Sequence, residues 1–292
     1  MKKILITGAN SYIGISVETY LNQWPERYQL DTVDMIGDGW KAVSFCGYDA
    51  VLHVAGLVHQ PQTKNDPAQA EAYDRINHRL AVETAEKAKR EGVRQFLFLS
   101  SASVYGLNAP VGKVVMITED TPLNPTDNYG ISKKKAEEGL QNLQDSGFKV
   151  AILRPPMIYG KGCKGNYQTM VKLARKLPVF PKVSNQRSML YMENLAEFIR
   201  LLIDDEAEGI FCPQNREYVN TSEMVNLIAH AHGKGILLIG GFTWALKLLA
   251  SVTGIVDKAF GSLCYDVQLS SYPKDYCVKD LQESILETEI LN

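Results

Sequence analysis

The sequence has little net charge. Its 292 residues include 31 Lys and Arg against 33 Asp and Glu, which gives a formal net charge of −2 at pH 7. Such a balance provides no general attraction to nucleic acid or to an anionic membrane, so recognition of a phosphorylated ligand requires a local site. The apolar share of 45% and charged share of 22% are ordinary for a soluble globular protein.

Cysteines are few and are not arranged in pairs along the sequence. There are five of them, and none forms a C-x-x-C motif. An odd number scattered through a long chain indicates neither a disulfide framework nor a zinc site, so no metal is expected. Thiols that stay reduced are typical of the cytoplasm. The five are Cys46, Cys163, Cys212, Cys264 and Cys277.

Long hydrophobic runs are also missing. The N-terminus begins with basic residues as a signal peptide does, but its apolar run stops after three residues. The longest apolar stretch, 236–252, is interrupted by Gly240, Gly241 and Lys247 and is short for a membrane span. A buried or amphipathic helix is expected there. The sequence therefore predicts a cytoplasmic protein without membrane insertion.

Short apolar runs alternate with segments of helical periodicity along the chain. This alternation predicts a doubly wound parallel sheet with helices on both faces. Between Asp34 and Ala50 there is room for one weak strand, at 40–45, so this part of the sheet is expected to be abbreviated. The segment 155–187, rich in Gly, Pro and Lys, is expected to be an insertion over the sheet edge. The expected strands are 3–7, 29–33, 50–54, 95–99 and 149–153, and the expected helices are 12–23, 73–91, 129–143 and 193–203.

A glycine-containing turn joins the first expected strand to the first helix. Gly8 permits the tight turn, and Gly14 lets the helix pack closely on the strand. The N–H groups and the dipole of such a helix N-terminus face a pyrophosphate, which predicts a Rossmann-type dinucleotide-binding fold. Ser11 stands where many such loops have glycine, and its hydroxyl can donate to phosphate. A plain strand–turn–helix connection is the alternative. The candidate cofactor-binding residues here are Gly8, Asn10, Ser11, Tyr12, Ile13 and Gly14.

Asp34 lies at the end of the second expected strand, 20 residues beyond Gly14. A carboxylate there accepts hydrogen bonds from the adenosine ribose hydroxyls and repels a 2′-phosphate. This favours NAD over NADP as the cofactor. The alternative is a solvated turn aspartate ahead of the glycines at 37 and 39.

Tyr129 and Lys133 are four residues apart in an expected helix, so their side chains share one face. A phenol with a pKa near 10 is a poor base at neutral pH. A nearby ammonium group stabilises the phenolate and brings it into range, so the two form a candidate catalytic pair. Alone, the spacing is common and is usually a surface pair. Lys134 and Lys135 extend the basic run, but they are expected on a solvated helix face and give no reason to predict nucleic-acid binding.

Serines follow the expected strand at 95–99. Ligands of doubly wound sheets bind at the carboxyl ends of the strands, so a hydroxyl here can hold the reacting oxygen of a substrate. Ser101 and Ser103 are both candidates, and the chemistry alone does not choose between them. Serines at strand ends also commonly form local turns.

Taken in order, these motifs resemble the extended short-chain dehydrogenase/reductases. The resemblance is to the NAD-dependent sugar-nucleotide epimerase/dehydratase family, of the UDP-glucose 4-epimerase type, and it weakens after Asn215. Two departures stand out: Met157 replaces the usual asparagine of the Arg-x-x-Asn-x-Tyr-Gly element, and Ser44-Phe45 stands where an Asp-Leu or Asp-Val pair usually touches adenine. The matching motifs are Thr-Gly-x-x-x-x-x-Gly at 7–14, His-Val-Ala-Gly at 53–56, Asn77, Ser-Ser-Ala-Ser-Val-Tyr-Gly at 100–106, Tyr-Gly-x-Ser-Lys at 129–133, Arg-Pro-Pro-Met-Ile-Tyr-Gly at 154–160 and the segment 187–196.

The resemblance implies roles for particular residues. Ser101 is implied to assist the catalytic Tyr129. Ala55, Gly56, Asn77, Lys133 and Pro155 are implied to line the NAD site. The residues implied to contact a UDP-sugar are Ser103, Asn166, Phe180 and Arg187.

The resemblance also implies a domain organisation. An NAD-binding domain is expected at 1–155, with 187–212 returning to it, and a smaller substrate-binding lobe at 156–186 and 213–292. A homodimer is expected through the helices that begin near Tyr73 and at Tyr129. His59 is expected to be a solvated loop residue.

The family's shared step is oxidation at C4 of a hexose. Dehydratases place an Asp-Glu pair after the serine, whereas this chain has Ala102 and Ser103, which disfavours dehydration. A 4-epimerase acting on a UDP-hexose or UDP-N-acetylhexosamine is therefore expected. Two alternatives stay open: a reductase of a 4-keto-6-deoxy sugar nucleotide, and a non-catalytic dinucleotide-binding sensor.

Overall fold

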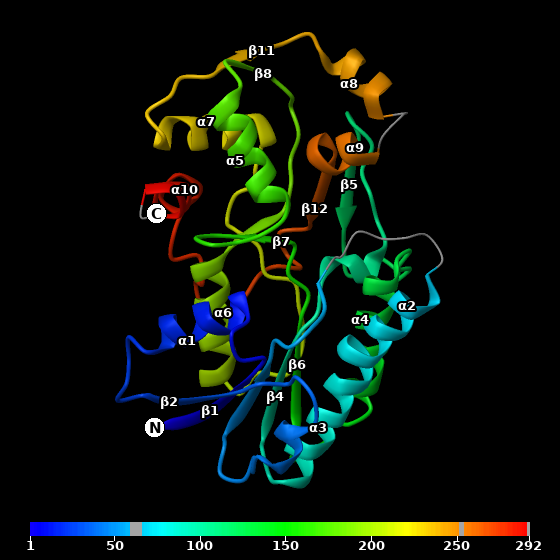
Figure 1. The fold of residues 1–292 in the computed structure, drawn as a ribbon, viewed down its shortest axis with the longest axis vertical. Helices are drawn as coiled ribbons and strands as arrows, with labels where there is room; N and C mark the ends of the chain where they lie inside the picture. Colours follow the sequence, from blue (N-terminus) through cyan, green and yellow to red (C-terminus); the bar gives the residue numbers. More distant parts are fainter. Residues whose placement is uncertain (59–65, 251–253, 291–292) are drawn as a thin grey trace. The chain divides into compact units, whose positions relative to one another are not determined.

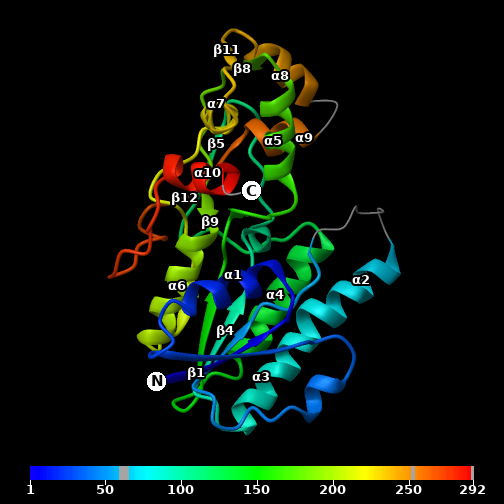
Figure 2. The same ribbon diagram turned by 60° about the vertical axis from the view of Figure 1, so that its left-hand side comes forward.

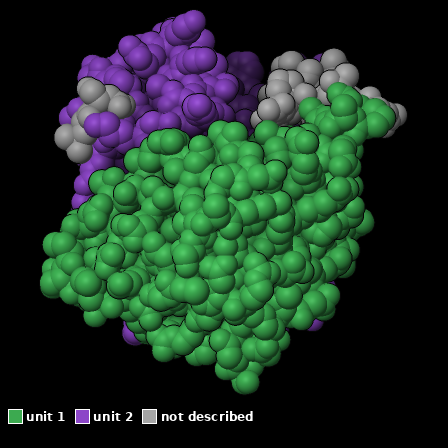
Figure 3. All heavy atoms as spheres, turned by 60° about the horizontal axis from the view of Figure 1, so that its bottom comes forward, with its two compact units in different colours: residues 1–106, 122–155, 196–212 green, residues 107–121, 156–195, 213–292 purple. Residues whose placement is uncertain are grey.

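The computed structural model describes residues 1–58, 66–250 and 254–290. His59 and the end of the apolar stretch 236–252 lie outside these residues. The described chain forms two compact units (Figure 3). Unit 1 consists of residues 1–106, 122–155 and 196–212, and unit 2 of residues 107–121, 156–195 and 213–292. Packing thus groups 107–121 and 187–195 with unit 2. The domains expected from the sequence were defined by what they bind, and those boundaries stay a prediction.

Unit 1 is built around a sheet of six parallel strands, in the order β10-β6-β4-β3-β1-β2. The Rossmann-type doubly wound fold predicted from the sequence is confirmed. The chain passes from β2, on one side of β1, to β3 on the other, so the switch point of the sheet lies between β1 and β3. The strands are β1 (Lys2–Thr7), β2 (Tyr28–Val33), β3 (Ala50–His53), β4 (Gln95–Leu99), β6 (Lys149–Leu153) and β10 (Gly209–Phe211).

Helices cover both faces of this sheet. The helices α2, α3 and α4 share one face and α1 and α6 the other (Figures 1 and 2). The central strands β3 and β4 are buried along their whole length, which explains their near-continuous apolar sequences. The helical segments are α1 (Tyr12–Leu21), η1 (Gly39–Ala42), α2 (Pro67–Tyr73), η2 (Asp74–Arg79), α3 (Leu80–Arg90), η3 (Ala102–Tyr105), α4 (Asn128–Gln141) and α6 (Met192–Asp204), which enters unit 1 at Ala196.

Two sequence expectations for unit 1 are wrong in detail. The weak strand expected at 40–45 is instead the short 3-10 helix η1, and Trp40 and Phe45 are apolar because they pack into the core between the sheet and its helices. The sheet therefore ends at β2 on this side. The helix expected at 73–91 begins earlier, with α2, and is interrupted by the π-helical turn η2. Such turns are rare and often accompany functional sites.

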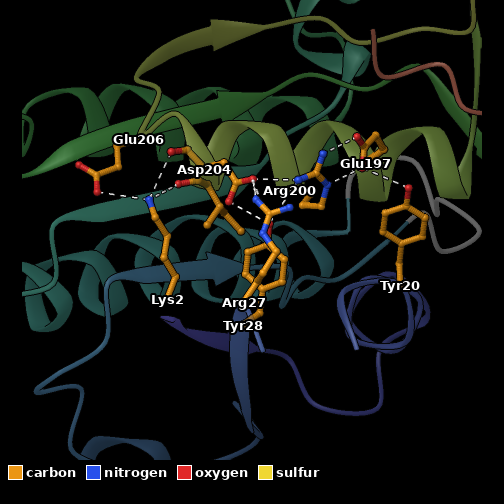
Figure 4. Close-up of polar contacts among 9 residues, drawn as sticks. Lys2, Tyr20, Arg27, Tyr28, Glu197, Arg200, Asp204 and Glu206 are labelled. Atoms are coloured by element: carbon orange, nitrogen blue, oxygen red, sulfur yellow. Dashed lines mark hydrogen bonds and ion pairs between the residues drawn. The ribbon is translucent and has the colours of Figure 1, made fainter. Parts of the chain in front are cut away.

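A network of polar contacts joins α6 to strand β2 and to helix α1, which covers the same face of the sheet (Figure 4). Arg200 pairs with Glu197 at 2.6 Å and with Asp204 at 2.8 Å. Asp204 also accepts a hydrogen bond from the Tyr28 hydroxyl in β2 at 2.8 Å, and Glu197 accepts one from Tyr20 in α1 at 3.1 Å. These contacts join parts of the chain that are more than 170 residues apart, so 196–212 belongs to unit 1.

The described residues of unit 2 form three two-stranded parallel sheets, β12 with β5, β7 with β9 and β11 with β8. The single helix expected within 236–252 is wrong, because this stretch forms strand β11, a glycine turn and then helix α8. Among the residues that the structure describes, none of the helices has the length and apolar character that crossing a bilayer requires. The strands are β5 (Val114–Ile117), β7 (Met157–Tyr159), β8 (Val179–Pro181), β9 (Met189–Tyr191), β11 (Leu237–Ile239) and β12 (Ser262–Tyr265). The helices are α5 (Asn166–Lys176), α7 (Thr221–Ala231), α8 (Thr243–Ala250), α9 (Gly254–Phe260) and α10 (Leu281–Ile290).

Gly106 allows a prediction for the stability of unit 1. Its φ is +65°, and a Cβ there would lie 1.9 Å from the Asn124 carbonyl oxygen. We expect Gly106→Ala to lower the free energy of unfolding by roughly 3 kcal/mol or more, because a backbone clash is added to the left-handed strain. Gly92→Ala is the control: its φ is +84°, nothing lies within 4 Å, and about 1 kcal/mol is expected. Urea denaturation measures both, and equal losses would contradict the assignment of a clash.

Candidate active site

The turn after β1 approaches the turn after β3 without room for side chains. A Cβ added to Gly8 would lie 2.8 Å from the backbone nitrogen of Ala55, and one on Gly14 would lie 3.2 Å from the Gly8 carbonyl oxygen. Gly8 has a φ of +95°, which a glycine tolerates best. This bare backbone at the switch point between β1 and β3 fits a dinucleotide pyrophosphate.

Helix α1 starts immediately after this turn. Ser11 is its N-cap, and the Ser11 Oγ accepts a hydrogen bond from the Gly14 backbone nitrogen at 3.1 Å. The serine that replaces the usual glycine therefore stabilises the helix end, while its own hydroxyl proton stays available for donation. Asn10 has a φ of +66°, a conformation that asparagine adopts more readily than most residues. Together with Tyr12 and Ile13, these residues form the start of a helix whose dipole favours an anion.

Asp34 follows the last residue of β2 and is exposed. One of its carboxylate oxygens accepts a hydrogen bond from the Ile36 backbone nitrogen at 2.9 Å. The side chain is therefore held in place while its other oxygen can accept from a ligand. This arrangement fits recognition of ribose hydroxyls.

Asn77 fixes the loop that carries Gly56. Its Oδ1 accepts from the Leu57 backbone nitrogen at 2.7 Å, and its Nδ2 donates to the Leu57 carbonyl at 3.0 Å and to the Ser132 hydroxyl at 3.1 Å. The residue is fully buried within the π-helical turn η2. The structure gives Asn77 a positioning role, and direct contact with a cofactor stays a prediction.

Tyr129 is buried near the start of α4, whose N-cap is Asp127. Burial raises the pKa of Tyr129 to about 12, while a hydrogen bond with the Ser101 side chain acts in the opposite direction. The phenol is therefore protonated at neutral pH in this structure. It acts as a base only where a positive charge stabilises its phenolate.

Lys133 carries such a charge into the same buried region. Its Nζ donates to the Leu99 carbonyl at 2.8 Å and lies 6.0 Å from the centre of the Tyr129 ring. It also lies over the Phe98 ring, 4.6 Å from its centre. Burial lowers the pKa of Lys133 to about 8, and the nearby Glu137 carboxylate raises it. An ammonium has three N–H donors, so donation to Leu99 leaves others for a ligand hydroxyl.

Ser101 and Ser103 differ in their surroundings, although the sequence alone did not separate them. Ser101 is the N-cap of η3, accepts from the Ser103 backbone nitrogen at 3.2 Å and contacts the Tyr129 hydroxyl. The Ser101 hydroxyl also donates to the Ser103 Oγ at 3.2 Å. Pro155 lies beside them, and its carbonyl accepts from the Ala102 backbone nitrogen at 3.0 Å. The structure thus brings Ser101, Tyr129 and Lys133 together in unit 1.

A buried ion pair beneath α4 was not predicted. Glu137 and Arg154 form several hydrogen bonds, the shortest of 2.6 Å, and both are almost completely buried. The Arg154 guanidinium also donates to the Tyr105 hydroxyl at 3.0 Å, and the Ser100 hydroxyl donates to Glu137. Glu137 is one helical turn after Lys133, and this spacing was the available sequence signal.

His53 is a second buried group that was not predicted to act in the site. Its Nδ1 is 2.7 Å from the Thr7 hydroxyl, and its ring stacks on Phe96 and Phe98. Burial, together with the charge of Lys133, lowers the pKa of His53 to about 3. The imidazole is therefore neutral and adds no second positive charge beside Lys133.

Comparison with known protein families shows which family the chain belongs to. The model of the NAD dependent epimerase/dehydratase family matches residues 4–211, a span that includes the turn after β1 and all of α4. The chain belongs to this family. The family resemblance predicted from the sequence is thereby confirmed.

Three curated relatives are similar over most of their length. A UDP-glucose 4-epimerase of Vibrio cholerae is 30% identical over 91% of this chain and 88% of its own. An N-acetyl-α-D-glucosaminyl-diphospho-ditrans,octacis-undecaprenol 4-epimerase of Escherichia coli O157:H7 is 25% identical over 86% and 81%. A GDP-6-deoxy-D-mannose reductase of Pseudomonas aeruginosa is 26% identical over 78% and 79%.

Two solved structures share the fold. A UDP-glucuronic acid 4-epimerase from Bacillus cereus in complex with NAD superposes with a TM-score of 0.72, at 16% identity, and covers 98% of this chain and 97% of its own. RMD from Pseudomonas aeruginosa, complexed with NADPH, superposes with a TM-score of 0.74, at 19% identity, over 98% of each chain.

The residues predicted to contact substrate lie partly in unit 2. Asn166 is exposed at the start of α5, and Arg187 is half-buried and donates to the Gly261 carbonyl at 3.1 Å. Burial lowers the pKa of Arg187. Phe180 in β8 is buried against Phe260, with ring centres 5.8 Å apart, so its ring packs inside unit 2. Substrate contacts of these three residues stay predictions.

The buried charge of Lys133 allows a stability prediction. We expect Lys133→Met to raise the free energy of unfolding of the cofactor-free protein at neutral pH by about 1–2 kcal/mol, because the folded chain no longer buries an ammonium group. One pKa unit corresponds to about 1.4 kcal/mol, and loss of the hydrogen bond to Leu99 offsets part of the gain. Urea denaturation of the wild type and the variant measures the difference.

The pH dependence has a defined sign. The Lys133 pKa is 10.5 when unperturbed and about 8 in the folded chain, so the folded state binds fewer protons between these values. Wild-type stability should rise with pH through this window, and Lys133→Met should lose this rise. The exposed Lys135→Met is the control on the same helix and should keep it. A Lys133→Met protein that is less stable at neutral pH, or retains the rise, would contradict the prediction.

The ion pair beneath α4 allows a second stability prediction. We expect Glu137→Gln to cost about 3–5 kcal/mol, because it leaves the Arg154 guanidinium buried without a counter-charge. The neighbouring Glu138→Gln is the control, since Glu138 is 60% exposed and pairs only loosely with Lys134 at 3.9 Å. Thermal and urea unfolding measure both variants. Similar losses for the two would show that the buried pair is not required.

Proposed function

We propose that this chain is an NAD-dependent sugar-nucleotide 4-epimerase that acts on a UDP-hexose or a UDP-N-acetylhexosamine. The observation that carries the proposal is the contact of Ser101 with Tyr129, with the Lys133 ammonium beside the same ring. A phenol held between a hydroxyl and a buried cation is suited to exchanging a proton with a sugar hydroxyl.

The neighbours of Ser101 support epimerisation over dehydration. Removal of water from a 4-keto hexose requires an acid and a base at C5 and C6, and Ala102 has no ionisable group. Ser103 is engaged with Ser101, which leaves hydroxyls as the functional groups of this short segment. Exchange of a proton and a hydride at C4 is the chemistry that these groups can serve.

Each residue of the catalytic group then has a defined role. Bound NAD supplies the hydride acceptor and donor for C4. Tyr129 would take the proton of the 4-hydroxyl and later return it to the same oxygen, when the 4-keto sugar has turned over and accepts the hydride at C4 on its other face. Ser101 holds the reacting oxygen and the Tyr129 hydroxyl in one hydrogen-bonded group. Lys133 stabilises the phenolate and uses its remaining N–H groups to hold the ribose of the cofactor.

The choice of NAD rests on Asp34. Its carboxylate lies at the end of β2, where it accepts from ribose hydroxyls and repels a 2′-phosphate. Structural neighbours include both an NAD complex and an NADPH complex, so the fold itself accommodates either nicotinamide dinucleotide. An epimerase that returns the hydride to the same sugar needs no external reductant, which agrees with NAD.

The relatives also support a second candidate. One relative is a GDP-6-deoxy-D-mannose reductase, and reduction of a 4-keto sugar would use the same Ser101, Tyr129 and Lys133 in one direction only. Another relative acts on a sugar that is linked through diphosphate to undecaprenol. Its substrate and a UDP-sugar therefore share a hexose linked to diphosphate. Arg187 and Asn166 are the proposed contacts for this diphosphate, and a homodimer through α2–α3 and α4 is the proposed assembly.

Product analysis tests the proposal. Purified protein is incubated without added cofactor with UDP-glucose, UDP-galactose and their N-acetyl forms, and the sugars are separated. Interconversion of a C4 pair, with NAD released on denaturation, is the expected result. No conversion of these sugars, together with NAD(P)H consumption on a 4-keto-6-deoxy sugar nucleotide, would replace the epimerase by the reductase.

Substitution of the tyrosine separates an enzyme from a sensor. Tyr129→Phe keeps the ring and removes the hydroxyl, so conversion should fall at least about 100-fold, as expected for loss of a general acid–base group. NAD binding, measured by calorimetry, should change little. Tyr73→Phe is the control, because Tyr73 is a buried tyrosine whose ring packs against Tyr129. Full biological activity of Tyr129→Phe would favour the non-catalytic sensor.

A further inference from the structure

Unit 2 exposes an apolar strand face. In the parallel pair β8–β11, Val179 lies opposite Leu237, with Ile239 two residues further along, and all three are exposed. The alternate residue Phe180 is buried. Because side chains alternate between the two faces of a strand, one face packs inside unit 2 and the other presents three aliphatic side chains to solvent.

Helix α8 continues this apolar surface. A glycine turn at 240–241 leads from β11 to the exposed Phe242 and then to α8. On the helix, Trp244 and Leu248 are spaced by one turn and are 70% and 66% exposed. Leu246, on another side of the helix, is buried against Val111 and Val183. The helix is thus held by one side and presents its largest apolar side chains to solvent.

The apolar patch consists of these two parts. β8, β11 and α8 lie at the same end of unit 2 in both Figure 1 and Figure 2. Exposed apolar side chains gathered at one end of a unit, with tryptophan and phenylalanine among them, indicate an interaction site. The patch is Val179, Leu237, Ile239, Phe242, Trp244 and Leu248.

The segments that form the patch are basic. Residues 155–192 contain seven Lys and Arg and no Asp or Glu, and residues 232–256 contain two lysines and no acid. Lys182 directly follows β8, and its backbone nitrogen donates to the Ile239 carbonyl at 2.8 Å. Lys247 lies on α8 between Trp244 and Leu248, and both lysines are exposed. Arg175 and Lys176, at the end of α5, precede β8 and are exposed as well.

We infer that this apolar patch and its cations bind the surface of an anionic lipid bilayer. Tryptophan and other apolar side chains enter the boundary between headgroups and acyl chains, and flanking Lys and Arg side chains pair with anionic headgroups. Attachment of this kind is peripheral and needs no membrane-spanning helix. The inference concerns binding by unit 2 and does not depend on the proposed reaction.

The charge of the patch favours a bilayer over a second copy of the chain as its partner. Two copies joined through the same patch would bring Lys182, Lys247 and their neighbours face to face with their equivalents, which costs free energy. An anionic bilayer offers both an apolar layer and a negative surface. The patch is therefore complementary to a bilayer and not to itself.

Vesicle binding tests the inference with the full chain. Vesicles of phosphatidylglycerol and phosphatidylethanolamine are sedimented with the protein, and vesicles of phosphatidylcholine alone are the comparison. Binding to the anionic vesicles that weakens with added salt is expected. Trp244 also provides a direct signal, since Trp40 is buried and Trp24 is half-buried. Brominated acyl chains should quench the emission of the wild type and have little effect on Trp244→Phe.

Matched variants show which residues bind. Trp244→Ser with Leu248→Ser should lower vesicle affinity at least about tenfold. Lys182→Gln and Lys247→Gln should each lower it about fivefold at low salt. The apolar control is Val267→Ser with Val278→Ser, two exposed valines elsewhere in unit 2. The charge control is Lys3→Gln with Arg90→Gln, both exposed in unit 1. Circular dichroism checks the fold of every variant.

Three outcomes would overturn the inference. The first is no sedimentation with anionic vesicles. The second is binding that the control variants reduce as much as the patch variants do. The third is a dimer, seen by light scattering, that only Trp244→Ser with Leu248→Ser dissociates, without vesicle binding by the wild type. That result would assign the patch to a second copy of the chain.

Discussion

The burial of the Lys133 ammonium is the constraint on which the candidate active site depends. A buried cation is unfavourable unless groups around it compensate, and here they are the Leu99 carbonyl, the ring of Phe98 and the Glu137 carboxylate. The same low polarity that lowers the Lys133 pKa raises that of Tyr129. Burial therefore disfavours the Lys133 ammonium and the Tyr129 phenolate when each is charged alone. When both are charged, each ion stabilises the other.

The elements around this pair hold it by polar contacts made inside the protein. Glu137 connects α4 to Arg154 at the end of β6, and Asn77 connects the same helix, through Ser132, to the loop after β3. A buried network is stabilising only when its members are satisfied, so the helix has little freedom to shift along the sheet. That restriction positions Tyr129 beside Ser101.

The sequence predicted what depends on local spacing. The turn at Gly8 and Gly14 and the Tyr129–Lys133 pair follow from geometry within a few residues, and the parallel sheet follows from the alternation of patterns. Prediction from the sequence failed where tertiary packing overrides the local pattern. Trp40 and Phe45 are apolar because they pack into the core. Nothing in the neighbouring sequence distinguishes two such core residues from the apolar residues of a strand. The ion pair of Glu137 with Arg154 joins residues that only the folded sheet brings together.

The net charge says little about any one surface, for a related reason. A total of −2 averages over the whole chain, whereas electrostatic attraction decays within about 10 Å in physiological salt. What a surface attracts is set by the charges near it. The segments that contain β8 and α8 have basic residues and no acidic ones, although Glu223 in α7 and Asp257 in α9 lie on neighbouring elements. The apolar run 236–252 is divided, so that part of it stays exposed. A nearly neutral chain can therefore contain a surface with the charge and polarity of a bilayer-binding segment, and the segregation of charge in the fold decides its partners.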